Sequence, residues 1–419
     1  MKRVISLLFL FLILLSCSTA TKKEASEPVV EAFVLDPDID LSEIIANLDE
    51  EMLLSEWCDS ITYVPLETNT QNFIRVPSFV ITSEYITQYN HLYDWTGKYL
   101  GQIGKRGQGP CEDHGQIIHV LTFVGDHFYT QGRKFLEYDK NGVCTGKSLI
   151  LGGQKLWDSY RNFNRLGAIH GTKNQLVAFS YPDSVFFFST DFEITEKYPT
   201  GMEWDKPISA QSIDSPYYKY FTPYNDTLLF YNYFTDTVYH VAENKLIPKW
   251  VIHLNEKQKI STDYTYKFEE IFLGDYFTAQ QSGRLESSKG AKLLDHRILV
   301  HAIHETDNLL FILASEIMFA PKDRGLPPLS AFLVCIDKRT GAVSGAKKVV
   351  DDLGGLDSFA PKWGICNGIM VNAIWPYELQ EFVDKKKANN QSVDQRLIDL
   401  LNSVDEEDNP ILIFAHLKK

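Results

Sequence analysis

The chain has 419 residues and a formal net charge of −14, and 44% of its residues are hydrophobic. This length is enough for one large hydrophobic core or for two ordinary domains. The acidic balance argues against nucleic acid as a partner, because a phosphate backbone demands a basic surface.

Residues 1–16 have the character of a targeting segment. Lys2 and Arg3 form a basic start, and the apolar run after them is too short to span a bilayer. Leu14-Leu15-Ser16-Cys17 resembles a bacterial lipobox, which implies cleavage before Cys17 and lipidation of its thiol. The alternative is an ordinary signal peptide with an incidental cysteine. A lipid chain would anchor the protein to a membrane without spanning it.

Residues 17–56 predict a lipid-anchored tether that ends in a short helix. The part up to Glu31 is rich in Ser, Thr, Lys and Glu, a composition typical of flexible segments. Asp36-Pro37-Asp38-Ile39-Asp40 looks like the start of a calcium loop, but Leu41 and Asn47 stand where an EF-hand needs glycine and glutamate. We therefore disfavour calcium here. The apolar residues that follow have helical spacing, namely Leu41, Ile44, Ile45, Leu48 and Leu53.

A short hairpin pattern returns along the rest of the chain. In its clearest form an aromatic or β-branched run ends in Asp, and Gly follows within three or four residues. A hairpin that returns every ~45–50 residues is typical of a β-propeller, with one four-stranded blade per copy. The clear copies are Tyr93–Gly97, Tyr138–Gly142 and Cys335–Gly341, and the degenerate ones are Phe188–Phe192 and Tyr239–Lys245.

Chain order places the blades and two insertions. Residues 79–110, 117–151, 165–200 and 217–254 predict the first four blades. Residues 255–296 interrupt the pattern, and Tyr377–Asp405 is charged and of helical type inside the last blade. Ile61–Leu66 and Ile411–Leu417 are expected to share that last blade, because pairing the two ends of the chain closes the ring and removes an exposed sheet edge.

One glycine-rich stretch carries a family resemblance. Lys105-Arg106-Gly107-Gln108-Gly109-Pro110, with Glu112 after it and a Tyr-Asp-x-x-Gly-Lys turn before it, resembles the six-bladed β-propeller lipoproteins that are abundant in gut bacteria, with NHL-repeat-like propellers. The stretches Ser60–Thr68 and Glu406–Phe414 resemble the entry and closing strands of that family. The resemblance implies an all-β, six-bladed propeller over residues 57–419, with short helical insertions. Cys111 departs from the family pattern, since it replaces a glycine.

The cysteine and histidine patterns predict no catalytic or metal site. Cys58, Cys111, Cys144, Cys335 and Cys366 show no Cys-x-x-Cys spacing, so we favour isolated buried thiols, although the sequence leaves a disulfide open. There is no Gly-x-Ser-x-Gly and no His-Glu-x-x-His. His301 and His304 lie three apart in an expected strand, so their side chains face opposite ways, and His114 and His119 flank a loop.

The glycine-rich loop has two interpretations. Its glycines, with Lys105 and Arg106, resemble a cradle for an anion, but no Walker pattern is present. The favoured interpretation is a structural loop that carries the chain from one blade to the next. Binding residues nevertheless concentrate on loops of rigid scaffolds, so Lys105, Arg106, Gln108 and Glu112 are the candidate binding residues of the chain. Arg106 and Gln108 are expected to face the mouth of the propeller channel.

These patterns favour a non-catalytic lipoprotein of the cell envelope. It would bind a glycan, a peptide or an envelope protein, would contact the membrane only through its lipid anchor, and would not bind nucleic acid. No cofactor is expected, although an axial calcium ion is left open. The alternatives are a propeller hydrolase or lyase with an axial metal, and a structural subunit of an outer-membrane assembly. No acidic run follows Cys17, and in related lipoproteins such a run resembles a surface-export signal, which favours the periplasmic side of the outer membrane.

Overall fold

The computed structural model describes residues 36–74, 78–113, 119–131, 134–150, 166–172, 175–180, 184–199, 221–224, 227–232, 235–260, 296–317 and 329–418. These residues fall in one compact unit, Leu35–Lys419. The expected leader, the lipidation site Cys17 and most of the predicted insertion at 255–296 lie outside the described residues.

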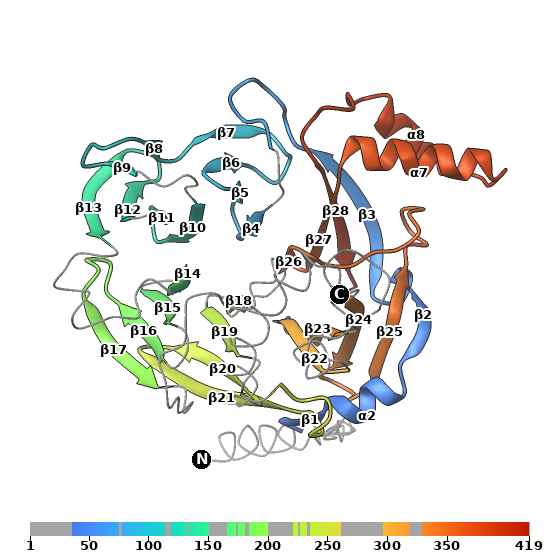
Figure 1. The fold of residues 1–419 in the computed structure, drawn as a ribbon, viewed down its shortest axis with the longest axis horizontal. Helices are drawn as coiled ribbons and strands as arrows, with labels where there is room; N and C mark the ends of the chain where they lie inside the picture. The colour runs from blue at the N-terminus through green and yellow to red at the C-terminus, as the bar shows by residue number, and fades with distance from the viewer. Residues whose placement is uncertain are drawn as a thin grey trace, which may run out of the picture. The chain divides into compact units, whose positions relative to one another are not determined.

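Six sheets of four or five strands stand around a common axis, so the unit is a six-bladed β-propeller, as predicted (Figure 1). Blades 1 to 3 follow each other along the chain, and each has four strands in sequence order. Blade 1 contains β4 (Phe79–Ile81), β5 (Ile86–Gln88), β6 (His91–Tyr93) and β7 (Tyr99–Gln102). Blade 2 contains β10 (His119–Val124), β11 (His127–Gln131), β12 (Lys134–Asp139) and β13 (Cys144–Ile150). Blade 3 contains β14 (Leu166–Gly171), β15 (Leu176–Ser180), β16 (Ser184–Phe188) and β17 (Ile194–Pro199).

Blades 4 and 5 each gain a fifth strand, and blade 6 joins the two ends of the chain. Blade 4 contains β18 (Phe221–Tyr224), β19 (Thr227–Tyr231), β20 (Thr237–Ala242) and β21 (Lys245–His253). Blade 5 contains β22 (Ile298–Glu305), β23 (Leu309–Ile317), β24 (Leu329–Asp337) and β25 (Val343–Val350). Blade 6 contains β26 (Gly364–Cys366), β27 (Ile369–Ile374), β28 (Ile411–Leu417) and β3 (Cys58–Pro65). The four blade positions predicted from the sequence are confirmed.

The repeated hairpin is the turn between the third and fourth strands of a blade. In blade 2, Asp139 Oδ1 accepts the N–H of Asn141 at 2.9 Å and that of Val143 at 2.9 Å, and Gly142 has φ +76°. The Asp side chain closes the turn by accepting two backbone N–H groups, and the glycine takes the left-handed conformation that other residues resist. The degenerate copy in blade 3 keeps the geometry with other residues, because Ser189 accepts from Asp191 and Phe192 has φ +62°.

The blades bury both of their faces, which accounts for the aromatic content of the chain. All five residues of β16 and all eight of β22 are buried. Phe179 of blade 3 and Phe230 of blade 4 have ring centroids 5.3 Å apart across the blade interface. A strand covered on both sides reads as a continuous apolar run, so the alternation expected of a half-exposed strand is missing.

The ring closes as predicted, by pairing β3 with β28. The two strands are antiparallel, with Ile61 opposite Ala415. Asn409, 1% exposed just before β28, fastens this joint, since its Oδ1 accepts the N–H of Ile74 at 2.8 Å and its Nδ2 donates to Glu67 O at 3.0 Å. The closing strand is therefore tied to the segment that leads into blade 1.

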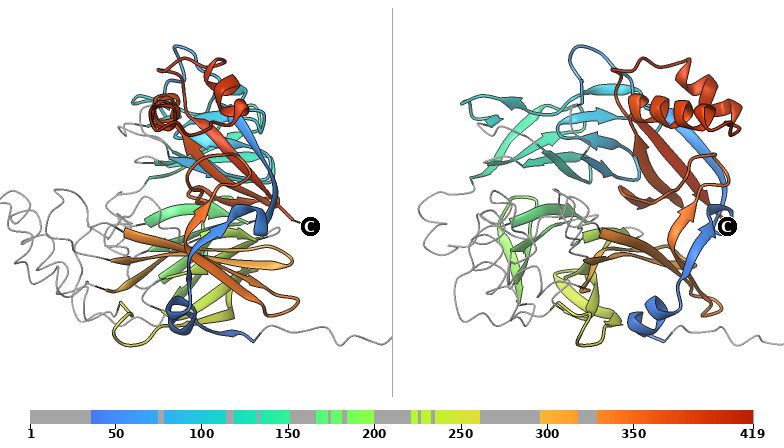
Figure 2. Two further views of the ribbon diagram at one scale, coloured as in Figure 1. Left: turned by 90° about the vertical axis from the view of Figure 1, so that its right-hand side faces the viewer. Right: turned by 45° about the vertical axis from the view of Figure 1, so that its right-hand side comes forward.

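Residues 38–53 form a strap that we call the N-terminal clasp. Its first strand β1 (Asp38–Asp40) runs parallel to β21 of blade 4, and its second strand β2 (Asp49–Leu53) runs parallel to β25 of blade 5. The helix α2 (Leu41–Ala46) joins the two strands along the outer edge of the ring (Figure 2). The described part of the expected tether, from residue 36 on, therefore belongs to blades 4 and 5, and the predicted helix is shorter than its apolar pattern.

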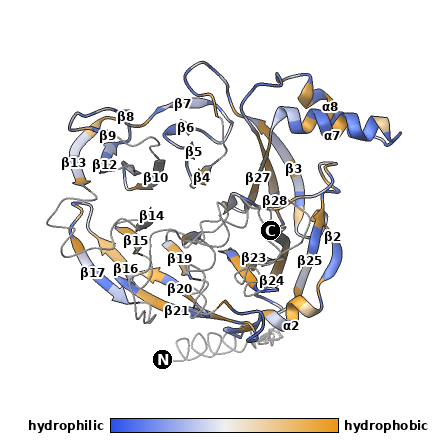
Figure 3. Cartoon of the chain, viewed as in Figure 1, coloured by the Kyte–Doolittle hydropathy of each residue, from blue (hydrophilic) through white to orange (hydrophobic). Residues whose placement is uncertain are grey.

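The predicted helical insertion in the last blade is present. The helices α7 (Pro376–Ala388) and α8 (Gln395–Leu401) lie between β27 and β28. They bury Leu379, Val383 and Leu397 against the core that blades 5 and 6 share. The rest of α7 is largely polar, whereas α8 also carries the apolar residues Ile398, Leu400 and Leu401 (Figure 3). A short 3-10 turn, η1 (Leu54–Glu56), links the clasp to β3.

Candidate binding surfaces

The glycine-rich loop folds back on itself through two very short strands. In this pair, β8 (Lys105–Arg106) runs parallel to β9 (Glu112–Asp113). The N–H of Gly107 donates to Asp113 O at 2.9 Å, and Glu112 Oε2 accepts the N–H of Gly109 at 2.8 Å. A Cβ at Gly107 would stand 2.1 Å from Glu112 Oε2, so this glycine admits the carboxylate that closes the loop.

The same loop is fastened to blade 2 by one covalent bond and several hydrogen bonds. Cys111 forms a disulfide with Cys144 at the start of β13. The Lys134 ammonium donates to Gly109 O at 3.2 Å and to Glu112 O at 3.1 Å, and the Lys134 N–H donates to the buried Asp113 Oδ2 at 2.7 Å. The polar groups on the inner side of the loop are therefore bonded to its own residues or to blade 2.

Three of the four predicted site residues lie on the exposed side of the loop, whereas the Glu112 carboxylate bonds to the backbone of the loop itself. Lys105, Arg106 and Gln108 are exposed and Glu112 is half-buried. The loop lies beside the outer strands of blades 1 and 2, since β13 is the last strand of its sheet (Figure 1). The expectation that Arg106 and Gln108 face the channel mouth is wrong, because the disulfide and Lys134 hold the loop on the rim. A binding role for the four residues stays a prediction.

The preference for isolated thiols is wrong for Cys111 and Cys144. Their Cα atoms lie 6.0 Å apart although they are 33 residues apart in the chain. The other described cysteines form no disulfide, and burial raises the pKa of both Cys58 and Cys335 to about 12. These two thiols stay protonated at neutral pH and are poor nucleophiles.

The histidine pair of β22 is buried in blade 5. His301 is 3% exposed and its Nε2 lies 2.7 Å from Ser315 Oγ, and burial lowers its pKa to about 4. His304 is 2% exposed. Within the described ranges no three His, Cys, Asp or Glu side chains are placed to hold a metal ion together. His114 and the side chain of His119 lie outside the description.

A charge cluster joins blades 4 and 5. Glu305 at the end of β22 is 6% exposed, and its carboxylate contacts the Lys249 ammonium at 2.9 Å and the Lys338 ammonium at 2.7 Å. Trp250 Nε1 donates to the same carboxylate at 3.0 Å, and the Lys249 ammonium lies 3.6 Å from the centroid of the Tyr224 ring. Each charged group has an opposite partner, so the cluster acts as an inter-blade link.

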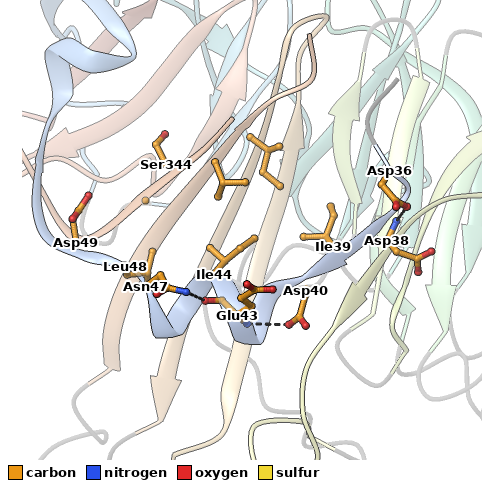
Figure 4. Close-up of a pocket in the computed structure, with 13 residues that line it drawn as sticks. Asp36, Asp38, Ile39, Asp40, Glu43, Ile44, Asn47, Leu48, Asp49 and Ser344 are labelled. Carbon is orange, nitrogen blue, oxygen red and sulfur yellow. Dashed lines mark hydrogen bonds between the residues drawn. The ribbon is translucent and has the colours of Figure 1, made fainter. Parts of the chain in front are cut away.

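A groove of about 500 Å³ lies between the clasp and the rim of blade 5 (Figure 4). We call it the clasp groove. Its apolar lining comes from Ile39, Ile44 and Leu48 of the clasp and from Ile336 and Val343 of blade 5. Its acidic lining comes from Asp36, Asp38, Asp40, Glu43 and Asp49. Leu48 packs so closely on blade 5 that a Cβ at Gly345 would lie 2.7 Å from its Cδ2.

A family model agrees with this architecture. The model described as Domain of unknown function (DUF4934) matches residues 36–416, which is most of the chain. The chain belongs to this family. The matched range begins at Asp36, so the clasp is part of the DUF4934 domain. The propeller that the sequence resemblance implied is confirmed, whereas its NHL-like and lipoprotein character stays a prediction.

Solved structures similar to this chain include two bacterial proteins. A Bacteroides fragilis protein described as exported has a TM-score of 0.60 and 16% identity over 89% of this chain and 99% of its own. BamB from Moraxella catarrhalis has a TM-score of 0.30 and 8% identity over 68% of this chain and 77% of its own. No curated protein matches the sequence. In the described part of the chain, no helix has the length and apolar character needed to cross a membrane.

Proposed function

We propose that this DUF4934 protein is a lipid-anchored protein of the cell envelope that holds a partner molecule on its propeller without transforming it. The Cys111–Cys144 disulfide is the main support for a location in the envelope, because such bonds persist in oxidising compartments outside the cytoplasm. The leader-like residues 1–16 and the lipobox-like Cys17 support it from the sequence. A structural neighbour described as exported agrees.

The shape of the molecule supports a binding role. The ring is closed by β3 and β28, linked between blades 4 and 5 by Glu305 and held at those two blades by the clasp, so it presents its loops and rim on a rigid scaffold. Rigid scaffolds with exposed loops concentrate binding residues. The partner proposed is a glycan, a peptide or an envelope protein, on the periplasmic side of the outer membrane.

Two measurements test the location. Maleimide labelling of the denatured, lipidated chain is expected to modify Cys58, Cys335 and Cys366, and also Cys111 and Cys144 once the sample is reduced. Membrane fractionation is expected to release the Cys17→Ala chain while the wild type stays bound, with Cys366→Ala as the matched control. The proposal would be contradicted if maleimide modified Cys111 and Cys144 without reduction and if both the wild type and the Cys17→Ala chain were found in the cytoplasmic fraction.

The binding role is tested by cross-linking in intact cells, followed by purification of the full chain. A specific partner is expected to be enriched over a control propeller of the same compartment. Rapid turnover of model esters or lactones by the purified chain, abolished by a calcium chelator, would instead favour the propeller hydrolase. Stable co-purification in a large outer-membrane complex would identify the partner as a structural assembly.

A further inference from the structure

We propose that the clasp groove docks a polypeptide segment that carries lysine or arginine beside an apolar side chain. This inference rests on the proposed binding function and names its site and the chemistry of its partner. It is carried by an apolar floor, an acidic rim and the absence of a basic residue from the groove lining.

The floor offers apolar surface that the fold leaves uncovered. Val343 at the start of β25 is 49% exposed, and Ile44 and Leu48 of the clasp are half-buried. Single exposed apolar side chains are ordinary, but these three line one concavity (Figure 4). Each Å² of apolar surface removed from water contributes about 25 cal/mol, so a partner side chain that fills the floor gains binding energy. A volume of about 500 Å³ is in the range of sites that accept a small ligand or a few side chains.

The rim supplies charge of a single sign. The five acidic residues named above line the groove, and no Lys, Arg or His is among the lining residues. Asp38 contacts His253 at 2.6 Å, and Asp40 Oδ1 caps α2 by accepting the N–H of Glu43 at 2.9 Å. The Glu43 and Asp49 carboxylates have no hydrogen-bond or ion-pair partner among the described residues and are exposed. These two groups are therefore available to a cationic partner.

The combination of floor and rim selects the class of occupant. A concave surface lined by one charge sign attracts the opposite charge and repels its own, which excludes polyanions from the groove. A neutral glycan would leave the carboxylates without a counter-charge. A polypeptide with Lys or Arg next to an apolar residue satisfies both parts, because the charges steer the approach and the apolar side chain fixes its position.

The test uses short labelled peptides and the full chain purified in detergent. The binding probe alternates Lys with Leu, one control peptide alternates Glu with Leu, and another alternates Lys with Ser. The Lys–Leu peptide is expected to bind in fluorescence anisotropy, more weakly at high salt, whereas the Glu–Leu peptide does not bind and the Lys–Ser peptide binds several-fold more weakly.

Two double variants separate the groove from general acidity. Glu43→Gln with Asp49→Asn removes two rim charges and is expected to weaken Lys–Leu binding by about three- to tenfold, the effect of two part-exposed ion pairs. Glu50→Gln with Glu51→Gln removes the same number of charges from β2, where these carboxylates contact Lys347 and Lys348 outside the groove. This matched control is expected to bind within about twofold of wild type. Val343→Ser is expected to weaken binding of the Lys–Leu peptide but not of the Lys–Ser peptide.

Several outcomes would overturn the inference. Equal losses in the two double variants would show that the peptide responds only to the overall negative charge, and equal binding of the Glu–Leu peptide would remove the role of the rim. Capture of an envelope partner in undiminished yield by the Glu43→Gln, Asp49→Asn chain would place the partner elsewhere and leave the proposed function standing. Intact groove binding without any captured partner would count against the proposed function alone.

Discussion

The glycine-rich loop and the N-terminal clasp both lie on the rim of the ring, but they are built in opposite ways. The loop has a conspicuous sequence, and its inner polar groups are bonded to blade 2 through the Cys111–Cys144 disulfide, Lys134 and Asp113. The clasp has an inconspicuous sequence, and it leaves the Glu43 and Asp49 carboxylates and half of Val343 open to solvent. The conspicuous glycine-rich motif therefore forms a structural loop, whereas the exposed carboxylates and apolar surface belong to the clasp, whose sequence has no motif.

The largest expected effect concerns the attachment of the clasp. Leu41 is fully buried in the core that blades 3, 4 and 5 share, so Leu41→Ala is expected to lower the free energy of unfolding by about 2–5 kcal/mol. Chemical denaturation measures it, and limited proteolysis is expected to cut the loosened clasp first. Leu53→Ala, at a side chain 46% exposed, is the matched control with a smaller loss. Equal losses at both positions would mean that the clasp is not anchored through Leu41.

The disulfide of the glycine-rich loop is expected to have the next largest effect. Replacing Cys111 and Cys144 together with Ser should lower the free energy of unfolding by about 2–4 kcal/mol, because the crosslink no longer restricts the unfolded chain. The wild type in reducing buffer should show a similar loss. Cys366→Ser, which removes a half-buried thiol that is not in a disulfide, controls for the substitution itself. A double variant as stable as the wild type would show that the hydrogen bonds alone hold the loop.

Those hydrogen bonds are tested separately through one side chain. Lys134→Met keeps the backbone N–H that bonds Asp113 but removes the ammonium that bonds Gly109 O and Glu112 O. We expect a loss of about 1–3 kcal/mol, since part-buried carbonyls lose a charged donor. Differential scanning calorimetry measures the change, and Lys140→Met, at an exposed turn residue of the same blade, is the matched control. Equal small changes in both variants would show that the loop does not depend on this ammonium.

Sequence reasoning succeeded where a local pattern determines the structure. The Asp–Gly turn forms from contacts within a few residues, as at Asp139 and Gly142, so its repetition gives the blade positions and the class of fold. The clasp depends on pairings between distant segments, such as Asp38 with Val251 and Asp49 with Ala346. Strands of three and five residues show no period of their own, and their partners lie some 200–300 residues away, so neither the clasp nor its groove was predicted.

The predictions about the disulfide and about the position of the glycine-rich loop were wrong for a related reason. Nothing in a separation of 33 residues indicates that Cys111 and Cys144 meet, because the hairpin of β12 and β13 brings Cys144 back to the loop. The glycine spacing indicated a tight loop but not the side of the ring on which it lies. The family resemblance fixed the fold for the same residues and gave no information on what they contact.

The smallest expected effect concerns Arg106, the most prominent of the predicted binding residues. Its side chain is exposed and has no hydrogen-bond or ion-pair partner among the described residues, so Arg106→Ala should change the free energy of unfolding by no more than about 0.5 kcal/mol. If the loop has only a structural role, Arg106→Ala should also leave the affinity for the partner captured by the wild type unchanged. A clear loss of partner binding at unchanged stability would instead give the loop a recognition role beside its structural one. In that case both the glycine-rich loop and the clasp would contact binding partners, and the two regions would differ only in how much they contribute to stability.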